Sequence, residues 1–444
     1  MSKLKIWAII LPFVFFFSRL YEGSLTGDAG MYACIAKDML INGNWLIPHL
    51  PDGVYFNKPP GFFWILAISF KLLGFTTFAA RFPVSLFAVL DSLVLFFIVK
   101  KITKDDIAAF ISVGSFVINL LILRFSTDVR QESLILLINL VAFLLLKPNF
   151  LKSFLYGLAL GFGFLVKGPF VLPGIISVSL VHLLKKRYKF LFHVGLSLTL
   201  GLIIFSLYLV YILNNQPSFF HIFFEEQILQ RISGQLSEGH PRPFYYYEWV
   251  FIKYLFPWNL ILVLLLIFKR HTIQLYLKKE LTIFNLILFL LFLLPIHLIS
   301  IKSLRYFYYC IPFISILIAL GFKDSIWSIR TVNFLKGATV LFGGIVLFLP
   351  VHFHKDGLKD LRPLVEVSLS SFKKVSLSES FDRRTRYSVK FYYDSLVFDP
   401  DKADYIIFRC QKRNALLRYR KFCLYRNKHE SSSGYNCKGL ERRN

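Results

Sequence analysis

The stretch "NLILVLLLIF", residues 259–268, decides the fold class, because it is apolar almost throughout and does not alternate with polar residues. Strands of a membrane barrel alternate apolar and polar side chains over segments of about ten residues. Continuous apolar runs are instead typical of helices that cross a bilayer, each needing about 20 residues. Similar runs, bounded by Lys and Arg, recur from residue 5 to about residue 351. The sequence therefore predicts an all-α polytopic membrane protein.

The composition supports the same class. Of 444 residues, 56% are hydrophobic, 50 are Phe and only 18% are charged, and the mean hydropathy is +0.58. A net charge of +26 would indicate nucleic acid in a soluble chain, but here we interpret most of it as a topology signal and expect no nucleic acid partner. The N-terminal "MSKLKIWAIILPFVFFFS" is followed by no small-residue cleavage site, which predicts an uncleaved first span.

Basic residues outnumber acids in five loops between the apolar runs, and the positive-inside rule places such loops in the cytoplasm. The loops contain Lys100, Lys101 and Lys104; Lys147 and Lys152; Lys185, Lys186, Arg187 and Lys189; Lys269, Arg270, Lys278 and Lys279; and Lys323, Arg330 and Lys336. About eleven spans, with a cytoplasmic N-terminus, put all five loops inside. These are roughly 5–21, 81–99, 106–123, 132–147, 153–167, 168–184, 190–213, 249–268, 281–300, 305–322 and 333–351.

The run "GFFWILAISFKLLGF", residues 61–75, is left out of this set. Fifteen helical residues rise only about 22 Å against a hydrocarbon core of about 30 Å, and Lys71 interrupts them. Counting this run as a span would also invert every basic loop after it. We predict a juxtamembrane or re-entrant helix on the outer face instead.

We expect two domains. Residues 1–351 form the transmembrane domain, with a first outer loop at 22–80 and a large outer loop at 214–248. Residues 352–444 form a small basic extracytoplasmic α/β domain, in which "YSVKFYYD" and "ADYIIFRC" are strand-like. The five cysteines show no metal-binding spacing. One pair among Cys410, Cys423 and Cys437 is a candidate disulfide.

Polar residues that the topology does not explain gather at the expected outer face. Charged side chains at the level of the membrane usually line a cavity or a pathway. A cluster of positive and negative side chains at the same level suggests a site for an anionic, polar ligand. These residues are Asp28, Lys58, Asp128, Arg130, Glu132, Lys167, Glu225, Glu226, Arg231, His240, Lys302 and Arg305.

Each of these residues also has a plain structural explanation. Asp28, in "TGDAGMYACIAKDML", either caps a juxtamembrane helix or takes part in catalysis. Lys58 precedes two prolines in "NKPPGFFW" and either meets a phosphate or extends to a lipid headgroup. In "STDVRQES", Asp128 and Glu132 share one face if the segment is helical, and Asp128 also suits a helix cap.

The remaining cations are open to the same two interpretations. Lys167 in "LVKGPF" fits a plain interfacial lysine. "HPRPFYYYEWV" and "KSLRYFYY" are typical of the aromatic belt at a membrane surface. His240 in the first of them, and Lys302 and Arg305 in the second, are nevertheless candidates for phosphate contacts.

These pieces together resemble the lipid-dependent glycosyltransferases of the GT-C superfamily, in the group of the aminoarabinose transferases (ArnT-like) and the dolichyl-phosphate-mannose protein mannosyltransferases. The resemblance runs from about residue 24 to residue 320. It is carried by "TGDAGMYACIAKDMLINGNWLIPHL", "NKPPGFFW", "FAARFP", "VRQESL", "VKGP", "HPRPFYYY" with "FPW", and "KSLRYFYYCIP", in this order.

The resemblance implies roles for particular residues. It implies that Asp28 is the catalytic carboxylate, that Glu132, better than Asp128, is the second acid, and that Lys58 holds the phosphate of a polyprenyl-phosphate sugar. Two positions depart from the family: Ala29 stands where relatives often have Glu, and Asn57 where many have an acid. A divalent metal therefore stays an open question.

From the residues and the resemblance we expect a glycosyltransferase of a bacterial-type inner membrane, with its C-terminal domain in the periplasm. It would move a sugar from polyprenyl (undecaprenyl) phosphate to a lipid (lipid A-like), glycan or protein acceptor. One alternative is a multi-span transporter or lipid flippase, which would use the midspan acid Asp91. A second alternative is a non-catalytic GT-C-like scaffold.

Overall fold

The computed structural model describes most of the chain. The described residues are 3–21, 23–230, 241–348, 358–359, 361–371, 374–378, 381–399, 402–409, 417–419 and 422–426. The chain divides into two compact units. The first, which we call the helical unit, comprises Met1–Leu20, Phe56–Phe62 and Arg81–Val351. The second, the mixed unit, comprises Tyr21–Tyr55, Phe63–Ala80 and His352–Asn444. The predicted boundary at residue 351 is thus one limit of the mixed unit, which also holds most of the predicted first outer loop.

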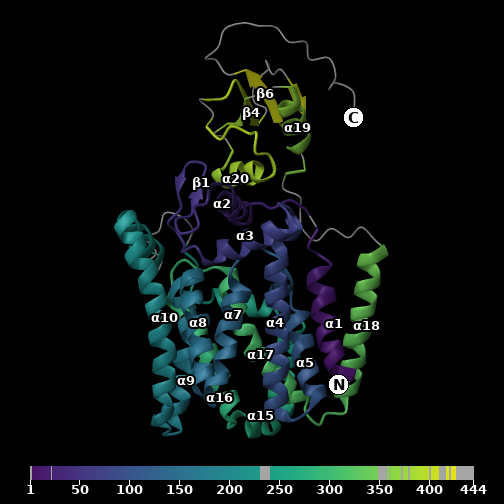
Figure 1. The fold of residues 1–444 in the computed structure, drawn as a ribbon. Helices are drawn as coiled ribbons and strands as arrows, with labels where there is room; N and C mark the ends of the chain where they lie inside the picture. Colours follow the sequence, from purple (N-terminus) through teal and green to yellow (C-terminus); the bar gives the residue numbers. More distant parts are fainter. Residues whose placement is uncertain are drawn as a thin grey trace. The chain divides into compact units, whose positions relative to one another are not determined.

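The helical unit consists of helices that run side by side along a common direction (Figure 1). Its elements are α1 (Lys3–Phe17), α4 (Thr77–Thr103, from Arg81 onward), α5 (Asp106–Val117), α6 (Leu120–Phe125), α7 (Glu132–Val141), η1 (Ala142–Leu146), α8 (Phe150–Lys167), η2 (Gly168–Val171), α9 (Leu172–Leu184), α10 (Tyr188–Asn215), α11 (Ser218–Phe220), the π-helix η3 (His221–Gln230), α13 (Tyr246–Tyr254), α14 (Trp258–Phe268), α15 (Arg270–Leu277), α16 (Glu280–Leu298), η4 (Leu304–Cys310), α17 (Ile311–Phe322) and α18 (Trp327–Phe348).

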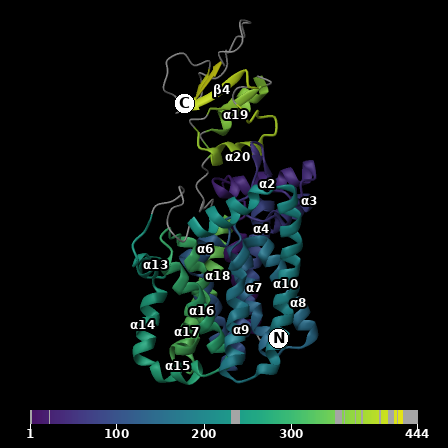
Figure 2. The same ribbon diagram turned by 90° about the vertical axis from the view of Figure 1, so that its left-hand side faces the viewer.

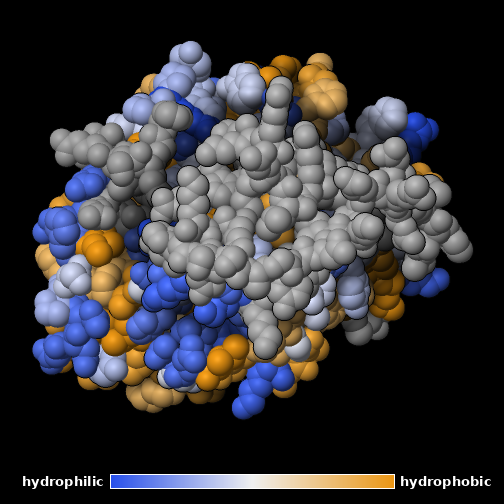
Figure 3. Space-filling model, turned by 90° about the horizontal axis from the view of Figure 1, so that it is seen from above, coloured by the Kyte–Doolittle hydropathy of each residue, from blue (hydrophilic) through white to orange (hydrophobic). Residues whose placement is uncertain are grey.

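Several of these helices are suited to a bilayer, which makes the chain a multi-pass membrane protein. Within the described residues, 5 stretches are long and apolar enough to cross a membrane, or 6 if the bent pair α13 and α14 is one span. That count does not confirm the expected number of about eleven. Large apolar side chains also reach the surface, among them Leu202, Leu207 and Val210 of α10. Hydrophobic residues likewise show around the rim of the view in Figure 3. A large exposed apolar surface is typical of a membrane interface.

The stretch 150–184 reverses direction at Gly168, as the two predicted spans 153–167 and 168–184 require. Helices α8 and α10 run in the same direction, because Ser197 donates a hydrogen bond to the Ser153 carbonyl and Phe205 stacks on Phe164. Helix α9 leads into α10 through a short turn, with His182 against Phe190, so it runs against both. Figure 1 shows these three helices next to one another.

Small residues on α8 allow α10 to come close. A Cβ atom added at Gly157 would lie 2.9 Å from Leu200 Cδ2 and 3.0 Å from the Ser197 carbonyl oxygen. At Gly161, an added Cβ would lie 2.7 Å from Ile204 Cδ1. Small residues spaced four apart are a common helix interface in membranes, where packing rather than the hydrophobic effect drives association.

The predicted span 249–268 is not one straight helix but a bent pair of helices, which together are long and apolar enough for one span. Helices α13 and α14 meet at 97° around Pro257, and Figure 2 shows them as two separate helices. Proline donates no backbone hydrogen bond and clashes with the preceding turn of a helix. The Asn259 side chain donates to the carbonyl groups of Phe251 and Ile252 at the break, which satisfies backbone acceptors that the interruption exposes.

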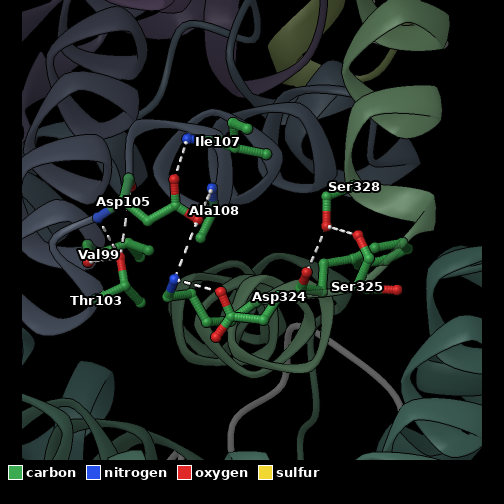
Figure 4. A network of polar contacts seen from close by, with 10 residues as sticks. Val99, Thr103, Asp105, Ile107, Ala108, Asp324, Ser325 and Ser328 are labelled. Carbon is green, nitrogen blue, oxygen red and sulfur yellow. Dashed lines mark hydrogen bonds and ion pairs between the residues drawn. The ribbon is translucent and has the colours of Figure 1, made fainter.

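The acids within the predicted cytoplasmic loops all pair with basic residues of those loops. Lys323 lies 3.8 Å from Asp105, which also caps α5, and 2.7 Å from Asp324 (Figure 4). The other two pairs are Lys100 with Asp106 at 2.5 Å and Arg187 with Glu280 at 2.7 Å. The contacts of Lys323 with Asp105 and of Arg187 with Glu280 each bring together two loops that are distant in the sequence.

The mixed unit combines helices with two small sheets. Its elements are α2 (Asp28–Asn42), β1 (His49–Leu50), β2 (Gly53–Val54), α3 (Gly61–Leu73, from Phe63 onward), α19 (Arg362–Ser371), β3 (Val375–Leu377), α20 (Arg383–Tyr392), β4 (Tyr405–Arg409), β5 (Leu417–Tyr419) and β6 (Phe422–Arg426). Strands β1 and β2 form a hairpin. The larger sheet has the order β3-β4-β6-β5, in which β3 and β4 are parallel and the other pairs antiparallel. Its core includes Leu364, Leu377 and Ile407.

Two predictions within the mixed unit had different outcomes. The strand predicted in "ADYIIFRC" is present as β4. The segment "YSVKFYYD" is wrong as a strand, because residues up to Tyr392 belong to helix α20. The Asp382 side chain caps this helix by accepting from the Thr385 amide at 2.9 Å. The predicted juxtamembrane helix at 61–75 is the 13-residue α3, which is among the shorter apolar helices. The cysteine side chains of the candidate disulfide lie outside the described residues.

Candidate active site

A buried ion pair between Glu132 and Lys167 forms the centre of the candidate site in the helical unit. Glu132 is the first residue of α7 and its side chain is only 1% exposed. Nζ of Lys167 lies 2.8 Å from Oε1 of Glu132 and also donates to the Tyr309 hydroxyl at 2.9 Å. Three segments that are distant in the sequence therefore converge on one ammonium group.

Local backbone structure places Lys167 at this point. Gly168 has a φ of +57°, a conformation that favours glycine, and its amide closes α8 on the Phe164 carbonyl. Lys167 is consequently the last residue of α8, where a cation complements the helix dipole. Its ammonium group also lies 4.8 Å from the ring centroid of Phe170 and 5.3 Å from that of Tyr309, within the range of cation–π attraction.

Arg305 adds a second cation to the same carboxylate. Its Nε lies 3.7 Å from Oε1 of Glu132, and it comes from η4, the segment that also supplies Tyr309. Among the described residues, Oε2 of Glu132 makes no hydrogen bond. Charges at this depth are tolerated when they are compensated, and here two cations compensate one anion.

Lys58 joins this group through a neighbour of Glu132. Its Nζ donates to Oε1 of Gln131 at 2.9 Å. The two prolines that follow Lys58 fix the backbone before the chain enters the helix that starts at Gly61. The structure thus brings three of the predicted phosphate contacts, Lys58, Lys167 and Arg305, together around Glu132, the predicted second acid.

Among the described residues, Asp128 and Lys302 form neither a hydrogen bond nor an ion pair with Glu132. Asp128 pairs with Arg130 at 2.6 Å. The interpretations of Asp128 as a helix cap and as an i, i+4 partner of Glu132 are wrong, because residues 126–131 are bends and α7 begins at Glu132. Lys302 is buried and donates to the Ile299 carbonyl at 2.7 Å.

Within the part of the chain that the structure describes, none of the four other candidates, Arg231, His240, Glu225 and Glu226, contributes to this group of charges. Arg231 and His240 lie outside the described residues. Glu225 accepts from the exposed His221 at 2.6 Å, and the side chain of Glu226 is not described.

Asp28 belongs to the mixed unit, and we describe it there by itself. It is the first residue of α2, and Gly27 is the N-cap, so the interpretation of Asp28 as a capping residue is wrong. Its position in the first helical turn still favours a negative charge. Oδ1 of Asp28 lies 3.2 Å from Nε of Arg384 at the start of α20. The pKa of the buried Tyr55 is raised well above its usual value, first by desolvation and then by nearby Tyr32 and Asp28.

Sequence reasoning missed three residues that contact candidate site residues: Gln131 and Tyr309 in the helical unit, and Arg384 in the mixed unit. Gln131 lies inside a quoted motif, and Tyr309 is four residues after Arg305, one turn along a helix, so both were within reach of the pattern. No local signal indicates Arg384, because its partner Asp28 lies in a distant part of the sequence. The described residues contain no group of three or more His, Cys, Asp and Glu side chains suited to a metal ion.

The fold of this chain is similar to that of two solved structures. The crystal structure of ArnT from Cupriavidus metallidurans bound to undecaprenyl phosphate matches with a TM-score of 0.71 at 14% identity, over 95% of this chain and 97% of that chain. The Archaeoglobus fulgidus oligosaccharyltransferase matches with a TM-score of 0.50 at 12% identity, over 90% of this chain and 63% of that chain.

Sequence comparisons match one family model and several named relatives. Residues 57–211 match the family model described as dolichyl-phosphate-mannose-protein mannosyltransferase. The chain is 30% identical over 276 residues to an undecaprenyl phosphate-alpha-4-amino-4-deoxy-L-arabinose arabinosyl transferase of Pectobacterium carotovorum subsp. carotovorum (strain PC1), covering 58% of this chain and 49% of that protein. The undecaprenyl phosphate-alpha-4-amino-4-deoxy-L-arabinose arabinosyl transferase 2 of Proteus mirabilis (strain HI4320) is 28% identical over 270 residues, covering 57% of this chain and 48% of that protein. The matched part spans about half the length of these relatives. The predicted resemblance to the ArnT-like group of the GT-C superfamily is confirmed.

Proposed function

We propose that this chain is a membrane glycosyltransferase that transfers a sugar from a polyprenyl (undecaprenyl) phosphate carrier to a lipid (lipid A-like), glycan or protein acceptor. The observation that carries the proposal is the excess of positive charge around Glu132. Lys167 and Arg305 both approach this one carboxylate, and Lys58 binds its neighbour Gln131. A buried site with more cations than anions attracts a phosphate group.

The expected chemistry uses these cations on the leaving group. When the bond between the anomeric carbon and the phosphate oxygen breaks, the carrier leaves as a phosphate monoester and negative charge develops on that oxygen. Cations that are already held in place stabilise this charge without reorganisation. Glu132 is engaged by two cations, so we assign it to holding Lys167 and Arg305 rather than to removing a proton.

Asp28 is the candidate general base for the acceptor hydroxyl. A carboxylate within hydrogen-bond reach of that hydroxyl can take its proton as the oxygen attacks the anomeric carbon. The site belongs at a bilayer surface, because the lipid tail of the carrier stays in the membrane. We place this surface on the periplasmic side of an inner membrane, in line with the positive-inside rule.

The test is transfer by purified protein in liposomes. Undecaprenyl phosphate-alpha-4-amino-4-deoxy-L-arabinose, the donor in the names of the relatives, is supplied with lipid A, and products are identified by mass spectrometry. We expect Asp28→Asn to abolish transfer and Asp38→Asn, on the same helix, to retain it. Transfer by wild type with equal activity in Asp28→Asn would remove the catalytic role of Asp28. No product with this or other polyprenyl-phosphate sugars would remove the function.

The alternative of a transporter or flippase has little support from Asp91. This acid is fully buried in α4, and the Tyr308 hydroxyl lies 3.5 Å from its Oδ2. Asp91 is therefore covered by the helices around it in this structure, whereas a transport pathway needs an acid that a substrate can reach. Movement of the donor lipid across the liposome bilayer without any transfer product would favour this alternative.

A further inference from the structure

Helices α2 and α20 pack along each other within the mixed unit, although they come from opposite ends of the chain. Asp28 contacts Arg384, and the Lys37 ammonium group donates to the Phe391 carbonyl at 2.8 Å. Because both residue numbers rise together, the two helices run in the same direction. Their N-terminal ends, which favour negative charge, therefore both lie at Asp28.

The packing of the two helices is close and is fixed at several points. A Cβ atom added at Gly30 would lie 2.0 Å from Ser388 Oγ and 2.9 Å from Ser388 Cα, so only glycine fits there. Lys37 also forms an ion pair with Asp394 at 2.8 Å. These contacts fix the position of α20 on α2, and with it the position of the Arg384 backbone.

A second anchor comes from the hairpin of the first loop. The Tyr387 hydroxyl donates to Asp52, which lies between β1 and β2, at 2.7 and 2.8 Å from its two carboxylate oxygens. Arg383 forms an ion pair with the same carboxylate. Arg386 donates to the Phe398 carbonyl at 2.5 Å. The neighbouring arginines of α20 are thus engaged elsewhere, while Arg384 faces the candidate base.

We propose that Arg384 is a positioning residue that holds the Asp28 carboxylate for catalysis, so that a residue of the C-terminal segment acts on the candidate base. The proposal rests on the proposed function. The Asp28 side chain is 14% exposed and that of Arg384 is 47% exposed, so the acid is largely buried beside an arginine that solvent still reaches. A guanidinium group binds a carboxylate with directional hydrogen bonds. One carboxylate oxygen fixed in this way sets the direction of the other.

The experiment compares Arg384→Ala and Arg384→Lys with the control Arg383→Ala, which removes a charge from the same helix and the same interface. All are made in the full chain, checked by size-exclusion chromatography and assayed in the liposome system. We expect Arg384→Ala to lower kcat on the order of 100-fold with little change in the KM of the donor. Arg384→Lys should recover part of the rate, and guanidinium chloride should raise the rate of Arg384→Ala alone.

The pH profile separates positioning from a structural role. Loss of the guanidinium group raises the pKa of an adjacent carboxyl, so the acid limb of kcat/KM should move to higher pH in Arg384→Ala and stay in place in Arg383→Ala. Arg384→Ala with wild-type kcat and an unmoved acid limb, beside an inactive Asp28→Asn, overturns this inference and leaves the proposed function standing. Equal losses of kcat in Arg384→Ala and Arg383→Ala, without rescue by guanidinium chloride, also overturn this inference. A wild type without transfer removes the proposed function and this inference with it.

Discussion

The ammonium group of Lys167 bridges Glu132 and Tyr309, lying 2.8 Å from the carboxylate of the first and 2.9 Å from the hydroxyl of the second. These partners are 35 and 142 residues away in the sequence. One lysine at the end of α8 therefore joins three separate helical segments. The same contacts supply the charge on which the proposed function depends.

Removing Lys167 should destabilise the helical unit. Lys167→Met leaves Glu132 buried with Arg305, whose Nε lies 3.7 Å from Oε1 of Glu132, as its remaining basic partner. Breaking a buried ion pair costs about 3–5 kcal/mol. We expect a lower midpoint of thermal unfolding in detergent, while Lys185→Met, at an exposed position, changes it little. The double variant Glu132→Gln, Lys167→Met should lose less than the sum of the single variants. A purely additive double variant would show that the pair does not interact.

Gly157 should be required for the contact between α8 and α10. Gly157→Ala places a Cβ 3.0 Å from the Ser197 carbonyl oxygen, and overpacking of this kind costs about 1–3 kcal/mol. Gly195→Ala is the matched control on α10, because nothing lies within 4 Å of its added Cβ. Alanine there should be neutral or gain up to about 1 kcal/mol from helix propensity. Equal unfolding midpoints for the two variants would contradict the close packing.

Cys34 should resist alkylation in the folded protein. Burial, and secondarily Asp38, raises the pKa of its thiol from 9.0 to about 12, and only the thiolate reacts. At pH 8 about one thiol in 10,000 is then ionised, compared with about one in ten at the usual pKa. We expect the Cys34 peptide to stay unmodified by iodoacetamide until a denaturing detergent unfolds the protein. Mass spectrometry of the peptides measures the modification. Rapid labelling of folded protein at pH 8 would refute this.

The raised pKa of the Cys34 thiol also makes the stability of the folded protein depend on pH. Because the pKa is higher in the folded state, the neutral thiol contributes its full stability below about pH 9. This contribution declines as the pH rises from about 9 towards 12, since the unfolded thiol ionises first. Cys34→Ala should therefore weaken the alkaline loss of stability relative to wild type.

The predicted orientation can be tested with single cysteines in a background without the five native ones. Lys185→Cys lies in a basic loop, and Ser370→Cys lies on α19 of the C-terminal segment, both at exposed positions. We expect a membrane-impermeant maleimide to label Ser370→Cys in intact spheroplasts and to label Lys185→Cys only after permeabilisation. The reverse pattern would invert the topology.

The sequence predicted local structure best where one segment carries its own signal. The hairpin of 153–167 and 168–184 and the short helix at 61–75 follow from run length and flanking residues. The errors lie where a flanking cap or an internal proline outweighs the composition of a segment. Residues 387–392 are aromatic enough to suggest a strand, yet Asp382 caps them as a helix that packs on α2. The run 249–268 is mostly apolar, yet it breaks at Pro257.

The sequence by itself determined that this is a helical membrane protein and which of its loops are basic, because hydropathy and charge add up along the chain and need no knowledge of contacts. It also picked out Lys58, Glu132, Lys167 and Arg305 as chemically unusual. Only the tertiary structure decided that these four meet, that Asp128 pairs with Arg130 instead, and that Asp28 contacts Arg384. Such pairings depend on how distant helices pack, and packing is a property of the folded chain rather than of any one segment.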